Sequence, residues 1–388
     1  MRLSNDALPT ESSCPSAAIV AASARSTYSL RGRPRHLLRR SLFAVPVAMS
    51  LGLGLLPATA QGAPLPAAAV PAVSATAAGA PVVQRIATFN VRTARATSDT
   101  RSWLQRAPDV AREIMVRRPN VVLLQELGPG RADGKTGTLQ GHARQTDSLT
   151  STLAKQGGGY YKLVRNTSYF PPGTQHGTQG ARILYDSRVV TLVTKCSNTT
   201  GTRTFSTSCA FDLPIAAGDS KEKLRSAAYA EFKDRRNGHR FFVVSAHMDS
   251  RHSGNDATEA RYTSLRAAQA RAVAYRIARV NPQNRPVVFG GDVNSWRDDR
   301  GNFAPQRALV ARGYRDTETT KIRFNHAYST VNHFKTTMAP SKSKAGGVHL
   351  DIVLVKGAKS VSRYENKMAR VDSTRPSDHN MVLADMQL

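Results

Sequence analysis

The stretch "VVFGGDVNSW", residues 287–296, combines an apolar strand, two glycines and two polar residues at its end. In an extended chain residues i and i+2 point to the same face, so Asp292 and Asn294 project together while Val293 turns toward the core. A carboxylate and an amide therefore share one face at the end of a buried strand. Gly, Asp and Asn also dominate turns for conformational reasons, so this stretch alone is equally consistent with a turn.

Polar residues stand at the ends of the other apolar runs as well. Besides Asp292 and Asn294, the residues in such positions are Asn90, Glu126, His247, Asp351, Asp378 and His379. Any one of them is more often a turn or boundary residue than a catalytic one. Because strand ends that gather on one edge of a sandwich bring their side chains together, the repeated pattern predicts a polar, metal-binding cleft.

The residue types in this predicted cleft restrict its chemistry. The chain has no Ser or Cys in a nucleophile setting, no Gly-rich phosphate loop and no HExxH zinc helix. Carboxylates and an asparagine suit a hard cation such as Mg²⁺, while two histidines beside acids suit proton transfer and charge stabilisation. Together they favour hydrolysis of a phosphate ester by water.

Hydrophobic periodicity predicts more strands than helices. Strands are expected over 84–90, 120–126, 180–186, 188–193, 287–292, 349–355 and 380–386, with a hairpin over 226–247 turning at Asn237-Gly238. Helices are expected over 101–119, interrupted by Pro108, and over 255–280, with Leu265, Ala268, Ala272 and Val273 on the apolar side. This mixture indicates an α+β fold, a sandwich of mixed sheets covered by helices.

The N-terminal region has the layout of an export signal. Residues 31–40 are strongly basic, 41–60 carry no charge, and Ala58-Thr59-Ala60 forms a small-residue cleavage site. A membrane anchor is the alternative, but Pro46 and several glycines weaken a helix there. Residues 39–43 loosely match a twin-arginine signal. We expect a secretion signal over 1–60, an Ala/Pro-rich linker or pro-segment over 61–83 and one folded domain over 84–388.

Cysteine content agrees with export. Cys14 lies in the predicted signal, which leaves Cys196 and Cys209 as an even pair. In an exported protein such a pair favours a disulfide that closes a short loop, worth about 3 kcal/mol by the chain-entropy model. The alternative is two unpaired, buried small side chains.

The charge balance is strongly basic. The chain carries 55 Lys and Arg against 27 Asp and Glu, a net charge of +28, and residues 61–388 keep +23 of it. Such an excess attracts polyanions, although a large net charge also keeps a secreted protein soluble and monomeric.

At these residues the sequence resembles the endonuclease/exonuclease/phosphatase superfamily, which has the DNase I-like fold. The resemblance runs from about Gln84 to Leu388. It rests on the order and spacing of "ATFNVRT", "VVLLQE", "VVSAHMD", "GGDVNSW", "HLDIVLV" and "SDHNMV". It implies a four-layer α/β/β/α sandwich with the active site at one rim.

The resemblance also implies roles for the predicted cleft residues. Glu126 and Asn90 would hold Mg²⁺ or Mn²⁺, with Asp378 beside them. Asp292 and Asn294 would orient the attacking water and bind the scissile phosphate. His379, held by Asp351, would act as general base or charge stabiliser, and His247 would bind the phosphate or assist the leaving oxygen.

The sequence departs from the motifs of known family members in two places, which bear on the role of His247 and on the class of substrate. DNase I-like members pair a glutamate with the histidine matching His247, and residues 162–186 offer no obvious candidate. The run "GGVHLDIVL" lacks the Trp-Cys-Asp-Arg signature of inositol 5-phosphatases, and the low aromatic content disfavours a sphingomyelinase.

We therefore expect a secreted, monomeric, Mg²⁺-dependent nuclease acting on DNA, with RNA as a further substrate, and with no stable membrane association. The alternatives are a phosphodiesterase or phosphatase for lipids or small phosphate esters, and a non-catalytic basic binding protein of the same fold.

Overall fold

The computed structural model describes residues 82–95, 101–164, 180–196, 209–220, 223–297, 303–343, 346–368 and 375–388. The predicted signal, and all but the last two residues of the predicted linker, lie outside these ranges. None of the helices in the described ranges is both long and apolar enough to span a membrane.

Two mixed β-sheets form the centre of the domain. The first has the strand order β11 (Arg323–Phe324), β13 (Ser360–Lys367), β14 (Met381–Gln387), β1 (Val83–Asn90), β2 (Val121–Gln125), β4 (Arg182–Asp186), β3 (Tyr161–Leu163). The second has the order β10 (Arg315–Asp316), β12 (Asp351–Lys356), β9 (Val287–Asp292), β8 (Arg240–His247), β7 (Ser226–Asp234), β5 (Val190–Leu192), with β6 (Ala210–Asp212) also paired to β7.

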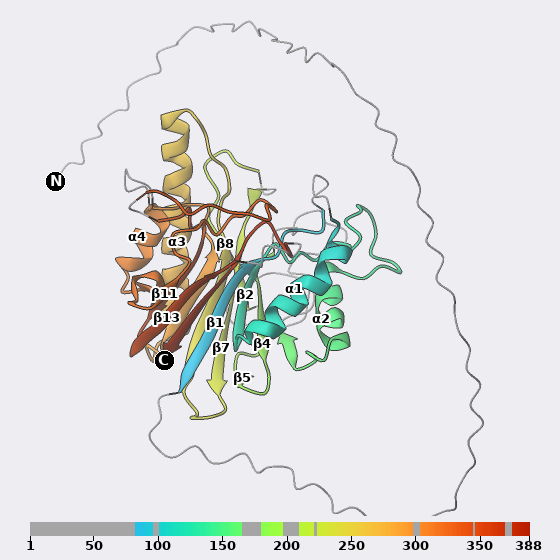
Figure 1. Ribbon diagram of the computed structural model, residues 1–388. Helices are drawn as coiled ribbons and strands as arrows, with labels where there is room; N and C mark the ends of the chain where they lie inside the picture. The colour runs from blue at the N-terminus through green and yellow to red at the C-terminus, as the bar shows by residue number, and fades with distance from the viewer. Residues whose placement is uncertain are drawn as a thin grey trace, which may run out of the picture. The chain divides into compact units, whose positions relative to one another are not determined.

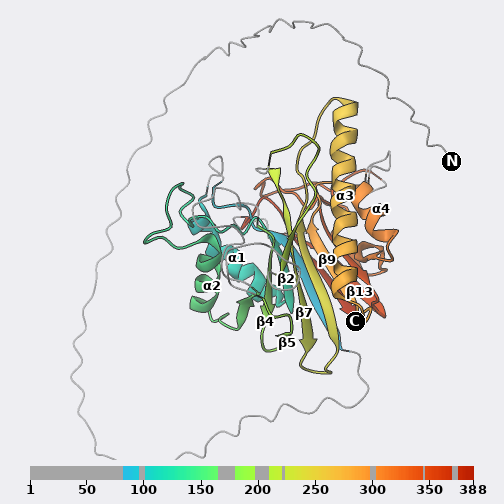
Figure 2. The same ribbon diagram turned by 180° about the vertical axis from the view of Figure 1, so that it is seen from behind.

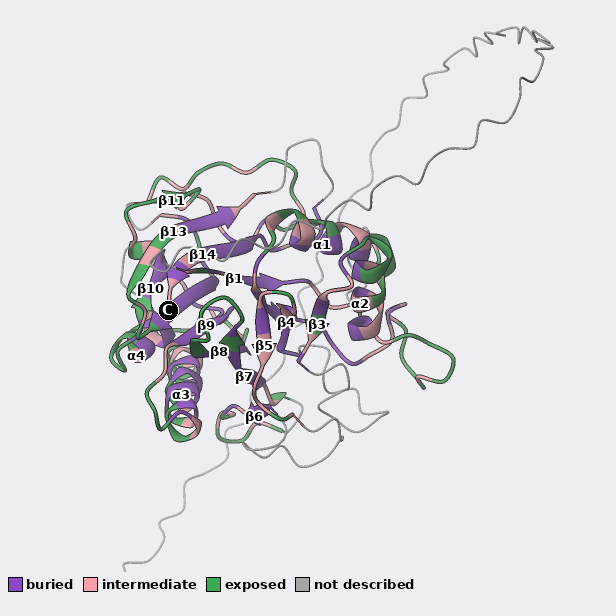
Figure 3. Cartoon of the chain, turned by 90° about the horizontal axis from the view of Figure 1, so that it is seen from below, coloured by how far each residue is buried: buried purple, intermediate pink, exposed green. Residues whose placement is uncertain are grey.

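Helices cover the outer face of each sheet. The helices α1 (Trp103–Arg117) and α2 (Gln145–Lys155) pack on the first sheet, and α3 (Asp256–Val280) and α4 (Ala304–Val310) pack on the second (Figures 1 and 2). A short 3₁₀ helix, η2 (Thr317–Thr319), follows β10. The predicted four-layer α/β/β/α sandwich of the α+β class is confirmed, and Figure 3 shows its strands largely buried between the helices.

Alternation along the strands decides which side chains face the other sheet. In β1, Ala87 and Phe89 contact the α1 layer, whereas Ile86 lies in the core between the sheets. In β9, Phe289 packs in the α3 layer and Val288 lies between the sheets. By the same period of two, the terminal polar residues of these strands also face the space between the sheets.

The glycine pair in β9 lets its neighbours approach closely. A Cβ on Gly290 would lie 2.5 Å from Leu123 Cδ1 of the opposite sheet. A Cβ on Gly291 would lie 2.2 Å from the Ala246 carbonyl oxygen of β8. Glycine at both positions therefore allows β9 to pack tightly enough to bring Asp292 beside the ends of the neighbouring strands.

The structure differs from the sequence-based elements in several places. The helix predicted to break at Pro108 is continuous over Trp103–Arg117, because its buried apolar face stabilises it despite one missing hydrogen bond. The paired runs near residue 187 belong to different sheets, as β4 and β5. On α3, Ala268 and Ala272 are only partly buried and Arg266 is fully buried. The elements that were not predicted are α2, α4, η2, β3, β6, β10, β11 and β13.

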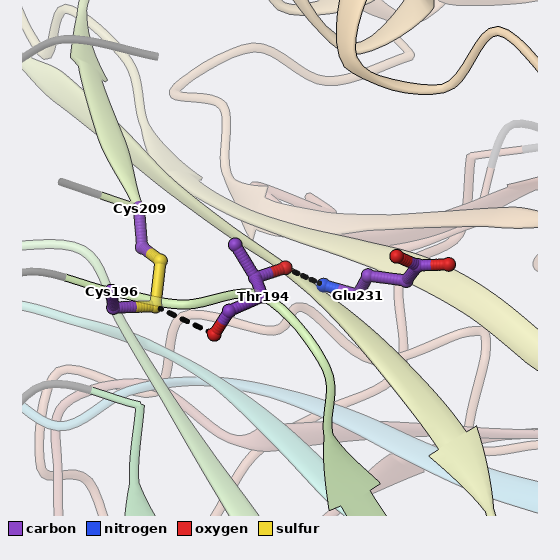
Figure 4. Close-up of a disulfide and its surroundings, with 4 residues drawn as sticks. All are labelled: Thr194, Cys196, Cys209 and Glu231. Carbon is purple, nitrogen blue, oxygen red and sulfur yellow. Dashed lines mark hydrogen bonds between the residues drawn. A yellow bond between two sulfur atoms is a disulfide. The ribbon is translucent and has the colours of Figure 1, made fainter. Parts of the chain in front are cut away.

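The predicted disulfide is present. Cys196 follows β5 and Cys209 precedes β6, and the two sulfur atoms are bonded (Figure 4). Thr194 lies beside the bridge: its hydroxyl accepts a hydrogen bond from the Glu231 backbone N–H at 2.7 Å. Both bridged segments flank β7, so the disulfide ties down one edge of the second sheet.

Candidate active site

The predicted polar residues meet at one edge of the sandwich. They come from the C-terminal ends of β1, β2, β8 and β9 and from the N-terminal ends of β12 and β14. Strand register explains the meeting, since Asp292 pairs with His247 of parallel β8 and with Asp351 of antiparallel β12. All eight residues expected in the site lie at this edge.

Asp292 lies at the centre of the cleft and is almost completely buried. Its Oδ1 accepts a hydrogen bond from the Asn294 backbone N–H at 3.0 Å, and its Oδ2 accepts one from Asn90 Nδ2 at 3.0 Å. His247 Nε2 lies 3.5 Å and His379 Nε2 lies 3.9 Å from the same Oδ2. Burial raises the pKa of Asp292 to about 7; His379 opposes this rise, and Asp351 adds to it.

His379 and Asp351 form a buried pair. His379 Nδ1 donates a hydrogen bond to Asp351 Oδ2 at 2.8 Å, which directs Nε2 toward Asp292. Burial alone would lower the pKa of His379, but the Asp351 carboxylate, with Asp292 and Asp378, outweighs it and raises the pKa to about 10. At neutral pH this side chain is therefore an imidazolium.

His247 lies in the same cleft with the opposite protonation state. Burial lowers the pKa of His247 well below its usual range, and the positive charges of Arg225 and His379 lower it further. Its Nδ1 has no hydrogen-bond partner within the described ranges. Much of the segment searched for a glutamate partner, residues 165–179, lies outside them.

Glu126 and Asn90 form the wall of the cleft on the first sheet. Glu126 has a left-handed backbone, φ 59°, and its Oε2 accepts the Thr93 backbone N–H at 2.9 Å. Asn90 Nδ2 donates to Glu126 Oε1 at 3.1 Å as well as to Asp292. These two bonds of Nδ2 join a carboxylate of the first sheet to a carboxylate of the second. The Asn90 Oδ1 accepts a hydrogen bond from the Arg92 backbone N–H, which fixes the orientation of the amide.

Asp378 lies beside this wall. Asp378 Oδ2 pairs with Arg92 Nη1 at 3.1 Å. Ser377 Oγ lies 3.2 Å from Asp378 Oδ1 and donates a hydrogen bond to the Asn90 carbonyl oxygen at 2.7 Å. Asp378 is thus held next to Asn90 through Arg92 and Ser377.

The donor set fits a divalent cation. Ligand atoms of Asp292, Asp351 and His379 lie within 4.8 Å of one another. Because an imidazolium cannot coordinate a cation, the two carboxylates are the ligands that this group offers, and the buried Asp351 Oδ1 has no hydrogen-bond partner within the described ranges. Glu126 and Asp378 add two further carboxylates to the cleft. Carboxylate and amide oxygens are ligands that hard divalent cations prefer, so the cleft suits a divalent metal ion. The group of three differs from Glu126, Asn90 and Asp378, the metal ligands expected from sequence, which lie in the same cleft.

Sequence reasoning missed Arg106, a fully buried residue of α1. Its Nη1 donates to the carbonyl oxygens of Val91 and Pro376, both at 2.9 Å, and its Nη2 donates to that of Arg92 at 3.2 Å. One guanidinium therefore joins the loop after Asn90 to the segment that leads into Asp378 and His379. Its spacing, three residues after Trp103 and four before Val110, places it on the apolar face of the helix, and this is the sequence signal that could have separated it from exposed Arg112.

Arg225, just before β7, is a second missed residue. Its Nη2 donates to Ser250 Oγ at 2.9 Å. Burial lowers the pKa of Arg225. The nearby carboxylates of Asp249, Glu126 and Asp292 act in the opposite direction and raise the pKa, but burial has the larger effect. The guanidinium thus adds positive charge to the cleft from the side of the second sheet.

Comparison with known proteins agrees with this geometry. The model of the Endonuclease/Exonuclease/phosphatase family matches residues 87–379, and the chain belongs to this family, whose members are phosphoester hydrolases. Comparison with curated proteins gives no match.

Solved structures show the same fold. An endonuclease/exonuclease/phosphatase family protein from Bacteroides thetaiotaomicron is 19% identical with a TM-score of 0.56, over 79% of this chain and 98% of that one. A mannosyl-6-phosphatase from the same organism is 19% identical with a TM-score of 0.56, over 79% of this chain and 100% of that one. A family protein from Bacteroides vulgatus is 18% identical with a TM-score of 0.55, over 79% and 99%.

The contacts of Arg106 lead to a stability prediction. Arg106→Met should lower the free energy of unfolding by about 3 kcal/mol, because buried carbonyl groups lose charged donors, and should also lower turnover. The control is Arg112→Met on the same helix, where the side chain is 64% exposed and pairs with Asp109; it should change stability by less than about 0.5 kcal/mol. Urea unfolding followed by circular dichroism measures the stability of both variants. Equal unfolding midpoints for the two would contradict the structural role assigned to Arg106.

Proposed function

We propose that this chain is a divalent-metal-dependent phosphodiester hydrolase that cleaves nucleic acid. The observation that carries the proposal is the arrangement around Asp292. Its Oδ2 lies within 3.9 Å of a nitrogen atom in each of Asn90, His247 and His379, which come from three different strand ends. Such a cluster matches the needs of water attack on phosphorus, which requires an oriented water and stabilisation of the negative charge that develops.

The contacts of each cleft residue suggest its role in the reaction. Asp292, fixed by Asn90 and by the Asn294 backbone, orients the water and accepts its proton. His379, held by Asp351, places a positive charge toward the developing phosphorane. Neutral His247, with Asn294, contacts the phosphate or the leaving oxygen. A divalent ion bound by Glu126, with Asn90 and Asp378 beside it, would neutralise phosphate charge.

Charge supports a polymeric substrate. Residues 61–388 have a net charge of +23, and a phosphate polymer releases counterions wherever several Lys or Arg side chains neutralise it. A small phosphate ester offers no such gain. DNA is the favoured polymer, and RNA is a further candidate.

Hydrolysis of a small phosphate ester is the second candidate. One structure of the same fold is a mannosyl-6-phosphatase, and the fold alone does not decide between substrates. A non-catalytic binding protein has less support, because none of the eight site positions carries an apolar residue.

We also propose that the protein is exported as a monomer. The basic and apolar segments before Ala60 support export, and the disulfide between Cys196 and Cys209 suits an oxidising compartment.

Variants of the buried pair test the mechanism. His379→Ala should lower kcat by about 10²- to 10⁴-fold, because it removes the imidazolium that faces Asp292. Asp351→Asn should give a smaller loss, since it only misorients the imidazole. EDTA should abolish turnover, and Mg²⁺ or Mn²⁺ should restore it.

The matched control is His239→Ala, in the exposed turn between β7 and β8, which should leave kcat unchanged. Near-normal turnover of His379→Ala would refute the assigned role.

Salt dependence tests the substrate class. Raising NaCl from about 50 to 200 mM should lower plasmid cleavage about tenfold or more, while hydrolysis of a small phosphodiester should change little. Rates are measured on plasmid, RNA, a hexose phosphate and a simple diester under identical metal concentrations. Robust hydrolysis of the hexose phosphate without plasmid nicking would favour the small-ester phosphatase instead.

The mass of the secreted protein tests export. A chain that begins near Gln61 and has no alkylatable thiol before reduction is expected. Retention of residues 31–60, or two free thiols, would contradict the proposal.

A further inference from the structure

An aromatic pair lies on the two segments that follow His247 and Asn294 along the chain, and it has no part in the chemistry described above. The rings of Trp296 and His252 lie 5.4 Å apart at an interplanar angle of 53°. Trp296 is half-buried, and the His252 side chain is 37% exposed. The only other tryptophan, Trp103, is the buried first residue of α1 and donates to Ser148 Oγ, so Trp296 is the one that reaches the surface.

The two rings are carried by the loops that carry catalytic residues. Trp296 is two residues after Asn294, and His252 is five residues after His247. Asn294 Nδ2 donates to the Met248 carbonyl oxygen at 3.1 Å and thereby joins the two loops between the cleft and the aromatic pair. Both rings thus lie on short segments that are tied to each other and lead directly out of the cleft.

The loop that carries His252 is held rigidly by α3. Glu259 contacts His252 Nδ1 through Oε1 at 3.1 Å and accepts the Ser253 backbone N–H through Oε2 at 2.8 Å. Buried Arg266 donates to the same Glu259 Oε1 at 2.7 Å and to the Arg251 carbonyl oxygen at 2.7 Å. Because the ring is fixed before binding, a ligand would bind it with little loss of conformational freedom.

We propose that Trp296 and His252 form a subsite for a nucleobase of the strand whose phosphodiester lies in the cleft. This inference rests on the proposed nuclease function. Bases stack on aromatic faces irrespective of sequence, and cations beside such a platform contact the adjoining phosphates. Exposed Arg297, 5.0 Å from the centroid of the Phe303 ring, supplies that charge next to Trp296. The polar neighbours Glu259 and Arg297 do not suit an acyl chain.

The test compares two polymers with the same backbone charge. One is a single-stranded oligodeoxynucleotide, and the other is a sugar-phosphate chain of equal length in which every residue is abasic. Trp296→Ala should lower kcat/KM on the oligodeoxynucleotide about 10- to 100-fold, and on the abasic chain it should change little. Trp296→Phe, which keeps a ring, should recover most of the loss.

The control variant is Tyr275→Ala, which removes another exposed aromatic residue, 58% exposed near the C-terminus of α3. It should leave both substrates unaffected. Equal losses of Trp296→Ala on both polymers, or no loss on either, would overturn the subsite while leaving the nuclease function intact. A loss confined to a hexose phosphate would show that the platform binds a sugar and would also overturn it.

Binding measured in EDTA separates the two proposals. If the wild-type protein cleaves neither polymer, the nuclease function fails, and fluorescence anisotropy still decides the subsite. Weaker binding of the oligodeoxynucleotide, but not of the abasic chain, by Trp296→Ala supports it. Identical binding of both polymers by the variant and the wild type rejects it.

Discussion

A hydrogen bond between the two sheets, from Asn90 Nδ2 to Asp292 Oδ2, holds the cleft together. Asn90 ends a strand of the first sheet and Asp292 ends a strand of the second, so this 3.0 Å contact fixes their separation at the edge. Below it, buried Gln125 accepts from Thr88 Oγ1 at 3.2 Å and donates to Ser245 Oγ at 3.1 Å. These polar groups satisfy one another across the interior, which makes their burial tolerable and the spacing of the sheets specific.

The site residues come from both sheets, so the distance between the sheets sets the geometry of the site. Asn90, Glu126 and Asp378 come from the first sheet, whereas His247, Asp292 and Asp351 come from the second. His379 lies just before β14 of the first sheet, yet its ring bonds Asp351 of the second. A small displacement of one sheet would therefore separate the imidazole from its acid and the amide from both carboxylates. The large apolar core below the cleft resists such a displacement.

Local patterns predicted the parts of the site that depend on local geometry. Alternation and the two glycines placed Asp292 at a strand end, and the same reasoning placed Asn90, Glu126 and His247. Asn294 lies beyond the end of β9 with a left-handed backbone, φ 48°, so the extended-chain alternation expected for it is wrong, although the residue still lies at this edge. Arg106 and Arg225 escaped because their importance comes from which backbone loops lie beside them after folding. For the same reason nothing near residue 187 showed that β4 and β5 join different sheets. Long-range register decides such questions, and a single sequence carries little information about it.

The two histidines are equally buried, and their neighbours shift their pKa values in opposite directions. Both are buried within 4 Å of the same Asp292 oxygen, and burial lowers the pKa of each. For His379 the hydrogen-bonded Asp351 carboxylate more than offsets the effect of burial on the pKa, whereas for His247 the positive charges of Arg225 and His379 add to it. One cleft thereby holds an imidazolium and a neutral imidazole at the same pH. A reaction that needs both a fixed positive charge and an uncharged hydrogen-bonding group beside the phosphate requires that difference, and neighbouring charges, more than burial, create it.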